Sequence, residues 1–308
     1  MAFWKPTTNS TGDRHDCEPV LTNNKFQHMS LAQQRGNLPI ARQKDNILFA
    51  LEKFSVLVVT AETGSGKTTQ LPQFLHEAGW TNGGRCIVCT QPRRMAAITV
   101  AARVADELGC VLGEEVGYAV RFDSKSSDRT VIKYCTDGLL LRETMSDPLL
   151  SKYSVVLVDE AHERSLQSDL MLGLLKKIQR KRSDLRIIVT SATVDATAIK
   201  EFFETNTGAN KDNRAEDTAC VVTVEGRVHP VDIMYLQKPA ANYIIAAAET
   251  VLKIHSSEDK NGDILVFLPG AEEIDSCVNI LEERGEKFVN SLILIPLYSS
   301  LPIAMQMR

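Results

Sequence analysis

The sequence alternates short apolar runs with amphipathic stretches, and this alternation limits the fold more than any other feature. The apolar runs have the length and the β-branched content of buried strands, and the stretches between them repeat apolar residues with helical spacing. Strands that alternate strictly with helices form parallel sheets whose two faces are both covered by helices. We therefore predict an α/β fold with strands at 56–60, 86–90, 131–135, 155–158 and 187–190 and helices at 68–78, 95–108, 139–145 and 167–180.

Two polar segments divide the chain. Residues 1–37 show no sustained period, which is typical of a flexible arm, and residues 204–218 have the composition of a surface linker. Between them we expect one complete lobe over 38–203. Residues 219–308 are fewer than a usual domain of about 100–150 residues. We expect there an incomplete second α/β unit, with strands at 220–224, 231–235, 264–268 and 292–297 and helices at 242–255 and 271–283.

The charge balance excludes a general electrostatic attraction to nucleic acid or to anionic membranes. The sequence has 35 Lys and Arg against 39 Asp and Glu, so its net charge of -4 provides no cationic field. Any such binding must depend on local groups. No window contains the roughly 18 consecutive apolar residues of a membrane span, and the amino terminus lacks the apolar core of a secretory signal. We expect a soluble intracellular protein that does not bind membranes.

The seven cysteines are odd in number and lie mostly in apolar runs, unlike the paired cysteines of a small secreted domain. We expect them to be reduced. Cys86 and Cys89 have the spacing of a zinc or redox motif, but no second pair and no histidine cluster accompanies them in the sequence. Their apolar surroundings favour packing in a buried strand, so we predict no transition-metal site.

A glycine-rich segment joins the first predicted strand to the first predicted helix. Its sequence, Ala61-Glu-Thr-Gly-Ser-Gly-Lys-Thr68, is typical of a phosphate-binding loop, with alanine in place of the usual first glycine. Gly64 and Gly66 allow backbone amides to turn toward phosphate oxygens, and the helix amino terminus adds partial positive charge. Lys67 can reach the β and γ phosphates, and the Thr68 hydroxyl can bind Mg²⁺. The alternative is a glycine-rich turn that binds nothing, but the Lys-Thr pair and the flanking elements favour the loop.

Two adjacent carboxylates follow another predicted strand. Asp159 and Glu160 come directly after Val155-Val-Leu-Val158, at the strand end where ligands of open α/β sheets bind. Asp159 can support a magnesium shell, and Glu160 can contribute to it while orienting and deprotonating an attacking water. By itself, an acidic pair in this position is more often a solvated turn. Its occurrence with a phosphate loop in the same lobe favours the catalytic interpretation.

Short hydroxyl side chains follow the strand at 187–190. Ser191 and Thr193 can hydrogen-bond to the acidic element and relay its state toward a bound polymer. A Ser/Thr cap on a helix at 195–203 is an equally good interpretation of the spacing alone. His162 follows the acidic pair closely, although a lone histidine near a helix start is usually a surface residue or a satisfied core group.

Together these segments resemble the DEAH-box RNA helicases of superfamily 2. The order and approximate spacing of that family occur in Thr63-Gly-Ser-Gly-Lys-Thr-Thr-Gln70, Thr90-Gln-Pro-Arg-Arg94, Thr136-Asp-Gly138, Asp159-Glu-Ala-His-Glu-Arg164 and Ser191-Ala-Thr193. The opening of the family's second lobe is similar to Val224-Glu-Gly-Arg227 with Pro230-Val231, and to Phe267-Leu-Pro-Gly270 with Glu272-Glu273. The DEAH-box polypeptide thirty-five subgroup is the most similar, on Phe3-Trp-Lys-Pro6, His76-Glu-Ala-Gly-Trp80, Arg121-Phe-Asp123 and Tyr235-Leu-Gln237.

The resemblance implies a fold, cofactors and residue roles. It implies a RecA-like phosphate-loop NTPase lobe followed by an incomplete second RecA-like lobe, with ATP and Mg²⁺ as cofactors and RNA as partner. Lys67 would act in hydrolysis with Asp159 and Glu160, and His162 would couple hydrolysis to RNA binding with Ser191 and Thr193. The residues expected to contact ATP are Glu62, Thr63, Gly64, Ser65, Gly66, Lys67, Thr68, Thr69 and Arg103, the last of which would stack on the nucleotide base.

The resemblance also implies an RNA track at strand ends. The guanidinium of Arg93 can form paired hydrogen bonds with a phosphate, and Thr136, Asp137 and Gly138 can offer a hydroxyl and backbone amides at a helix start. Arg94 belongs to the same predicted track. Its alternative is an ion pair with an acidic neighbour on the surface.

The leading hypothesis is therefore an ATP-dependent RNA helicase with RNA-stimulated ATPase activity, represented by its amino-terminal part. The subgroup's association with the spliceosome implies pre-mRNA splicing, a nuclear location, and spliceosomal proteins or an activating partner. Because the family's arginine fingers follow beyond Arg308, we expect this chain alone to hydrolyse ATP weakly. The alternative is a truncated product that binds nucleotide, RNA or a partner without efficient hydrolysis. An unrelated phosphate-loop enzyme, such as a kinase or a transporter ATPase, would lack the ordered acidic, Ser-Ala-Thr and Arg-Arg elements.

Overall fold

The computed structural model describes residues 3–4, 29–192, 196–205, 217–226, 231–257, 262–284 and 292–306. Two units make up the chain: residues 26–230 form the first, and residues 1–25 with 231–308 form the second. The candidate site lies in the first unit.

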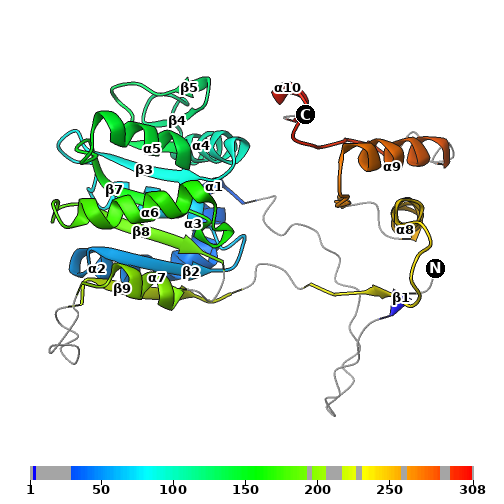
Figure 1. Cartoon of the computed structure of the whole chain (residues 1–308), viewed down its shortest axis with the longest axis horizontal. Helices are drawn as coiled ribbons and strands as arrows, with labels where there is room; N and C mark the ends of the chain where they lie inside the picture. Colours follow the sequence, from blue (N-terminus) through cyan, green and yellow to red (C-terminus); the bar gives the residue numbers. More distant parts are fainter. Residues whose placement is uncertain are drawn as a thin grey trace, which may run out of the picture. The chain divides into compact units, whose positions relative to one another are not determined.

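The predicted strands assemble into one mostly parallel sheet in the first unit (Figure 1). Its strand order is β5-β4-β6-β3-β7-β8-β2-β9, and β5 runs antiparallel to β4. Each of the five strands predicted for this lobe lies within two residues of its expected bounds. The strands are β2 (Val56–Ala61), β3 (Cys86–Gln91), β4 (Val116–Val120), β5 (Asp123–Lys125), β6 (Ile132–Thr136), β7 (Tyr153–Val158), β8 (Arg186–Ser191) and β9 (Ala219–Val224).

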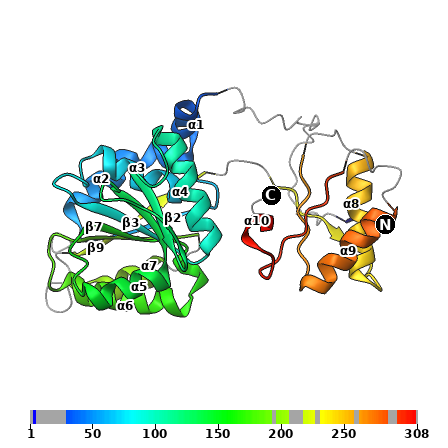
Figure 2. The same ribbon diagram turned by 90° about the horizontal axis from the view of Figure 1, so that it is seen from above.

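Helices cover both faces of the sheet (Figure 2). One face carries α2 (Lys44–Lys53), α3 (Lys67–Glu77) and α4 (Arg94–Leu108), and the other carries α5 (Asp137–Ser146), α6 (Leu166–Gln179) and α7 (Ala196–Phe203). All the helices predicted for this lobe are present. The mostly parallel α/β fold that the alternation predicts is therefore confirmed.

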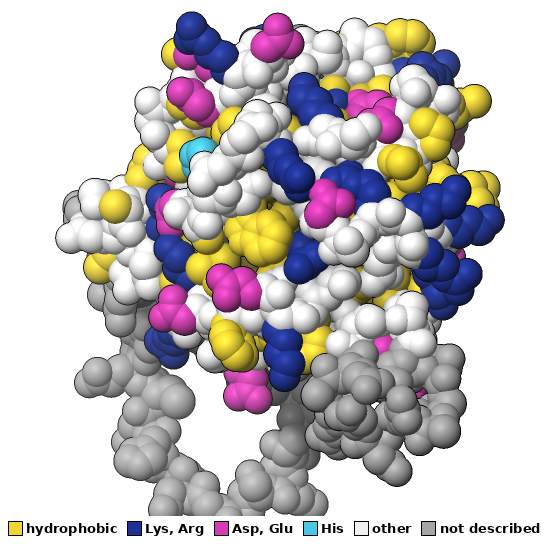
Figure 3. Space-filling view, turned by 90° about the vertical axis from the view of Figure 1, so that its left-hand side faces the viewer, with side chains coloured by type: hydrophobic (Ala, Val, Ile, Leu, Met, Phe, Trp, Pro, Cys, Tyr) yellow, Lys and Arg dark blue, Asp and Glu magenta, His cyan; other side chains and the backbone are white. Residues whose placement is uncertain are grey.

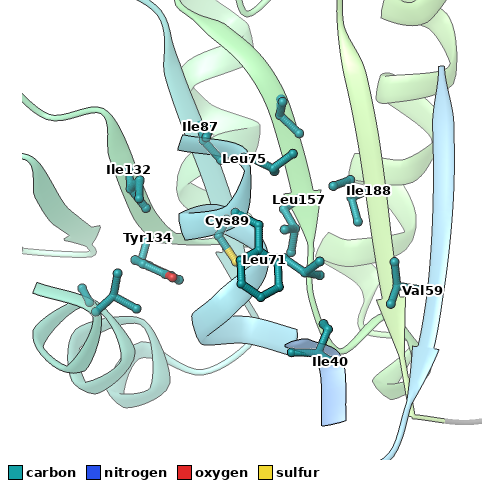
Figure 4. Close-up of a cluster of buried hydrophobic side chains, with 14 of the residues drawn as sticks. Ile40, Val59, Leu71, Leu75, Ile87, Cys89, Ile132, Tyr134, Leu157 and Ile188 are labelled. Atoms are coloured by element: carbon teal, nitrogen blue, oxygen red, sulfur yellow. The ribbon is translucent and has the colours of Figure 1, made fainter. Parts of the chain in front are cut away.

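Alternate strand residues supply the two cores. Val155 and Leu157 of β7 face the cluster beneath α2, α3 and α4, whereas Val156 and Val158 face the cluster beneath α5, α6 and α7. Successive side chains of a strand point to opposite faces, so a continuous apolar run fills both layers. Full burial of each such side chain contributes about 1.5–3 kcal/mol. Figure 4 shows the first cluster, with Leu71 and Leu75 of α3 among Ile40, Val59, Ile87, Cys89, Ile132, Tyr134, Leu157 and Ile188.

The Cys86 and Cys89 thiols are buried, which confirms the core-packing interpretation of this pair. They face opposite sides of β3, because Cys86 belongs to one core cluster and Cys89 to the other. Two side chains on opposite faces of a strand cannot hold one metal ion together. Burial raises the pKa of the Cys86 thiol to about 12, so it stays protonated at neutral pH.

The first lobe begins earlier than the composition predicts. Residues 31–37, expected to belong to a flexible arm, form helix α1 (Leu31–Asn37), which continues into a 3₁₀ turn over Pro39–Gln43. The Ser30 side chain accepts a hydrogen bond from the Gln33 amide, and the Gln33 side chain accepts one from the Ser30 amide. This capping box stabilises a short helix that is too polar to show an apolar period.

The boundary between the two units also differs from the prediction. Residues 219–224 were expected to open the second domain, but as β9 they pair in parallel with β2, from Val56 beside Ala219 to Ala61 beside Val224. The division falls after Pro230. The polar insert thus separates two elements of one lobe, because an apolar strand at the sheet edge satisfies its backbone groups by pairing with β2.

The second unit contains a pair of packed helices. Helices α8 (Tyr243–Ser257) and α9 (Ala271–Arg284) match their predictions and bury Ala248, Val251, Cys277 and Leu281 between them. A two-residue strand β1 (Phe3–Trp4) pairs antiparallel with β10 (Tyr235–Leu236), and a short helix α10 spans Ile303–Gln306.

Residues 264–268 and 292–297, predicted as strands, form no strand in the described part of this unit, and of 231–235 only Tyr235 does. Their apolar alternation is nonetheless present. Val266 and Leu268 pack against the helix pair, while Leu265 and Phe267 are exposed. The alternation of apolar residues therefore decides which side chains face the helices. A β-strand also requires backbone hydrogen bonds to a neighbouring strand, and these residues have none in the described part of the structure.

The surface agrees with the balanced charge of the sequence. Figure 3 shows one face of the molecule, on which Lys and Arg side chains are interspersed with Asp and Glu and with small apolar patches. Among the described helices, none is long and apolar enough to cross a membrane.

Candidate nucleotide-binding site

The phosphate loop lies between β2 and α3, as its sequence predicts. Gly64 and Gly66 have φ of 83° and 93°, in the left-handed region that glycine adopts without strain. Gly66 is the N-cap of α3, so the loop ends at the helix amino terminus. The Ser65 hydroxyl is buried and has no hydrogen-bond partner among the described atoms. Backbone amides, a buried hydroxyl and a helix start therefore form a cradle suited to an anion.

Lys67 is held inside this cradle. Its side chain is buried, and its ammonium donates to the carbonyls of Ala61 at 2.8 Å and of Glu62 at 3.1 Å. The loop thus fixes one positive charge beside its own backbone amides. A charge in this position can form charge-assisted hydrogen bonds with phosphate oxygens.

The loop is supported from outside by the segment that follows α1. The Ile40 amide donates to the Ser65 carbonyl at 3.2 Å, and Leu38 packs so closely that a Cβ on Gly66 would lie 2.8 Å from its Cδ1. Residues that composition assigned to the edge of the lobe therefore hold the phosphate loop in place. The Ser30-x-x-Gln33 capping pattern marks the start of helix α1, and it is the sequence signal from which that helix could have been predicted.

Asp159 is the centre of a buried hydrogen-bond network. Its carboxylate is fully buried and accepts from the hydroxyls of Thr68 and Thr190 and from Nε2 of Gln91 at 2.7 Å. The three donors come from α3, β3 and β8. The phosphate loop and the acidic element are thus joined directly, through Thr68, as the sequence interpretation requires. Gln91 and Thr190 are two site residues that the sequence interpretation did not identify.

Glu160 stands at the edge of this network in a strained conformation. Its φ is 53°, which is unusual for a residue other than glycine and is typical of functional sites. Burial, followed by the charge of Asp159, raises the pKa of the Glu160 carboxyl, while Lys67 and His162 oppose this shift. A glutamate with a raised pKa is suited to accept a proton near neutral pH.

His162 connects the acidic element to the end of β8. The Ala192 amide lies 3.3 Å from Nδ1 of His162 and donates toward it. Nδ1 also lies 3.3 Å from Oε2 of Glu160. Ser191, the last residue of β8, is buried, and Thr193 lies outside the described residues. The predicted Ser/Thr cap on the helix at 195–203, which is the alternative role of these hydroxyls, also involves residues outside the described part of the chain.

The predicted RNA residues lie at the ends of β3 and β6. Arg93 is exposed and pairs with Glu163 at 3.0 Å, whereas Arg94 donates to the Arg121 carbonyl at 2.8 Å. The acidic pairing that sequence analysis allowed for Arg94 is thus made by Arg93. Thr136 is the N-cap of α5, in which Gly138 occupies the second position. Their contacts with RNA stay a prediction.

Asp137 differs from the rest of this set because its side chain is buried. It accepts a hydrogen bond from the Ser168 hydroxyl at 2.8 Å, and burial raises the pKa of its carboxyl. The carboxylate therefore joins α5 to α6 and does not face solvent. Only the backbone of this residue can then serve the predicted RNA track.

Arg103 lies on α4 and pairs with Glu107 one turn later at 2.7 Å. Glu107 also accepts from the side chains of Gln70 and Gln73 on α3. Arg103 was predictable from the resemblance, whereas its partners were not. Glu107, Gln70 and Gln73 look like ordinary helix residues until the packing of α3 against α4 is known.

Comparisons with known proteins identify the family of this chain. The sequence profile of the DEAD/DEAH box helicase family matches residues 37–202. The chain is 47% identical over 323 residues to the human "Probable ATP-dependent RNA helicase DHX35" and to its Pongo abelii counterpart, and 47% identical over 312 residues to the Caenorhabditis elegans "Probable ATP-dependent RNA helicase DHX35 homolog". Each match covers all of this chain but only 45%, 44% and 42% of the respective relative, so the chain spans less than half of their length.

The profile covers the first-lobe segments on which the resemblance rests, among them the phosphate loop, the acidic element and the end of β8. The first unit is accordingly a RecA-like α/β lobe. The chain belongs to the DEAD/DEAH box helicase family.

Proposed function

We propose that this chain binds Mg·ATP at its phosphate loop and supplies the hydrolytic residues of an RNA-stimulated ATPase, and that the whole protein is an RNA helicase. The observation that carries the proposal is the hydrogen bond from Thr68 to Asp159, which joins the phosphate loop to the acidic element. The relatives named as ATP-dependent RNA helicases support the same activity.

The residues present fit a magnesium ion. Thr68, Asp159 and Glu160 offer hydroxyl and carboxylate oxygens, which are the hard donors that Mg²⁺ prefers. The described residues contain no group of three or more His, Cys, Asp or Glu able to hold a metal, so nucleotide phosphates and water would complete the shell. When bound, Mg²⁺ neutralises charge on the phosphates.

The protein's own groups divide the remaining work. Lys67 would exchange its loop carbonyls for the β and γ phosphate oxygens. Glu160 would orient the attacking water and accept its proton, a role that its raised pKa favours. His162 would transmit the state of this glutamate to β8 through the Ala192 amide.

RNA would bind across the carboxyl ends of the strands. Arg93, Arg94 and the amino terminus of α5 follow β3 and β6 at that edge of the sheet. Because the net charge of the chain is -4, affinity for phosphates must come from such local donors. We extend the proposal to a role in pre-mRNA splicing in the nucleus, with spliceosomal or activating partners. The support for this extension is the resemblance to the polypeptide thirty-five subgroup.

The test is a Glu160→Gln variant of the full-length protein in an RNA-stimulated ATPase assay. We expect kcat to fall by about 100-fold or more, the usual contribution of a general base, while ATP binding is retained. Glu163→Gln is the matched control, because this acid lies in the same segment and its carboxylate pairs with Arg93. Its turnover without RNA should be unchanged. Retained turnover in Glu160→Gln would contradict the assignment.

A further inference from the structure

Glu107 is a buried carboxylate on which side chains from three helices converge. Only 2% of its side chain is exposed. It accepts hydrogen bonds from Nε of Arg103 at 2.7 Å, from Nε2 of Gln70 at 2.8 Å and from Nε2 of Gln73 at 2.7 Å. Nε of Arg35, on α1, lies 3.8 Å away. The proposed function assigns no role to the Glu107 carboxylate.

The charge of Glu107 is maintained in this environment. Burial would raise the pKa of its carboxyl, but hydrogen bonds from Arg103, Gln73 and Gln70 outweigh burial and hold the pKa below its usual value. An ionised carboxylate with several donors is the strong kind of hydrogen-bond centre. It can therefore fix the side chains around it.

Short contacts connect Glu107 to the phosphate-binding helix. Gln70 also contacts the Thr69 hydroxyl at 3.0 Å, and Gln73 donates to the Thr69 carbonyl at 2.8 Å. Thr69 is the third residue of α3, whose first residue is Lys67. Both glutamines are fully buried. Glu107 is thus linked, through Gln70 and Gln73, to the first two turns of the helix that follows the phosphate loop.

Arg103 is the exposed member of this cluster. Its side chain is 47% exposed, and its Nε is bonded to Glu107. A guanidinium is planar, so a hydrogen bond at Nε restricts the rotation of the whole plane. The result is a flat cation on the surface of α4 that is linked through Glu107 to Gln70 and Gln73 of α3.

We propose that Glu107 is a positioning residue that fixes the plane of the Arg103 guanidinium, and that this plane is the platform for the base of a nucleotide whose phosphates bind at the phosphate loop. The inference rests on the proposed nucleotide site and adds to it the residue that sets this platform. Pre-organisation matters because a free arginine loses rotamer entropy when it stacks, and a fixed one does not.

The test compares two ligands that differ in the base. ATP carries a base, whereas inorganic tripolyphosphate carries only the phosphates, and both are titrated with Mg²⁺ into the 308-residue chain. We expect Glu107→Gln to weaken ATP binding about tenfold, as expected for loss of a cation–π contact, and to leave tripolyphosphate binding unchanged. Arg103→Ala should give the same pattern. The double variant should bind ATP no more weakly than either single one, because both changes remove one platform.

Glu77→Gln is the matched control. Glu77 lies at the other end of α3 and accepts from Arg35 at 2.8 Å and Lys44 at 2.6 Å, and these two cations, not Arg103, are its ion-pair partners among the described residues. This variant should leave the ratio of the two affinities unchanged. If Glu107→Gln does not fold, Glu107→Asp is the second variant, because it keeps the charge and withdraws the carboxylate by one methylene. In this variant too, the affinity for ATP should fall relative to the affinity for tripolyphosphate.

Three results would overturn the inference. They are equal weakening of both ligands by Glu107→Gln, additive losses in the double variant, and an unchanged ratio in Glu107→Asp. A wild-type chain that binds neither ligand would instead contradict the proposed function, so the two failures are distinguishable.

Discussion

Thr190→Val should loosen the sheet at the acidic element by a predictable amount. Thr190 is the fifth residue of β8, is fully buried, and donates its hydroxyl to the Asp159 carboxylate. Valine has the same branched shape and suits a strand equally well, so the change removes the donor and little else. It leaves a buried carboxylate oxygen without one of its partners.

The magnitude follows from the remaining contacts. Asp159 keeps its bonds from Thr68, from Gln91 and from the Glu160 amide at 3.0 Å, so a single charge-assisted hydrogen bond is lost. Such bonds are worth about 1.5–3 kcal/mol. We therefore expect a loss of about 2 kcal/mol, which corresponds to a roughly 30-fold increase in the opening equilibrium of β8.

Hydrogen exchange read by mass spectrometry on peptides from β2 and β8 measures this local opening without requiring two-state unfolding of a two-unit chain. Thr60→Val is the matched control, because Thr60 lies on the neighbouring strand β2 and donates to the neutral Thr223 hydroxyl at 3.0 Å. Loss of that partly exposed neutral bond should cost at most about 1 kcal/mol. If the two variants exchange alike, the reasoning about Asp159 is wrong.

Three further changes have clear expected outcomes. Lys67→Met should weaken ATP binding by about 100-fold in calorimetry, because charge-assisted bonds to phosphates worth about 3 kcal/mol are lost; unchanged affinity would contradict the cradle. Because burial and Asp159 raise the pKa of Glu160 and catalysis needs its ionised form, kcat of the full-length protein should decline on acidification at a higher pH than an ordinary glutamate gives; a profile flat to about pH 4.3 would exclude this. Gly117→Ala should lower the free energy of unfolding by about 1–3 kcal/mol, because the added Cβ would lie 2.6 Å from the Lys125 carbonyl oxygen. Gly173→Ala on helix α6, where an added Cβ has nothing within 4 Å, should raise the free energy of unfolding by about 1 kcal/mol. Thermal unfolding measures both changes, and the same sign for both would refute the packing argument.

The strands of the sheet core were predictable because burial on both faces makes each one a continuous apolar run. Strand β4 was missed, since Gly117 interrupts its pattern. The structure explains that glycine by the close approach of the Lys125 carbonyl, which no local pattern reveals. Helix α1 was missed for the opposite reason, because it has no buried residue and depends on its cap and on Arg35.

The candidate site was predictable where spacing alone encodes the chemistry. Lys67 and Thr68 follow from the loop pattern, and the adjacent Asp159 and Glu160 follow from a strand end. Gln91 and Thr190 were not identified, because a polar residue at the end of an apolar strand is also compatible with an ordinary strand terminus. Glu107 required knowledge of which helices pack together, since its donors Gln70 and Gln73 are more than thirty residues away.

The contact of Leu38 and Ile40 with the phosphate loop has a practical meaning for anyone who shortens this protein. A chain that begins at Leu38 would retain the phosphate loop, the acidic element and the Ser-Ala-Thr segment. It would nevertheless lack Arg35, whose guanidinium bonds to Gln70 at 2.9 Å and to Glu77 at 2.8 Å, and the capped helix that anchors the loop's outer support. A shortened form of the first lobe that keeps these contacts therefore starts at or before Met29 and extends through β9.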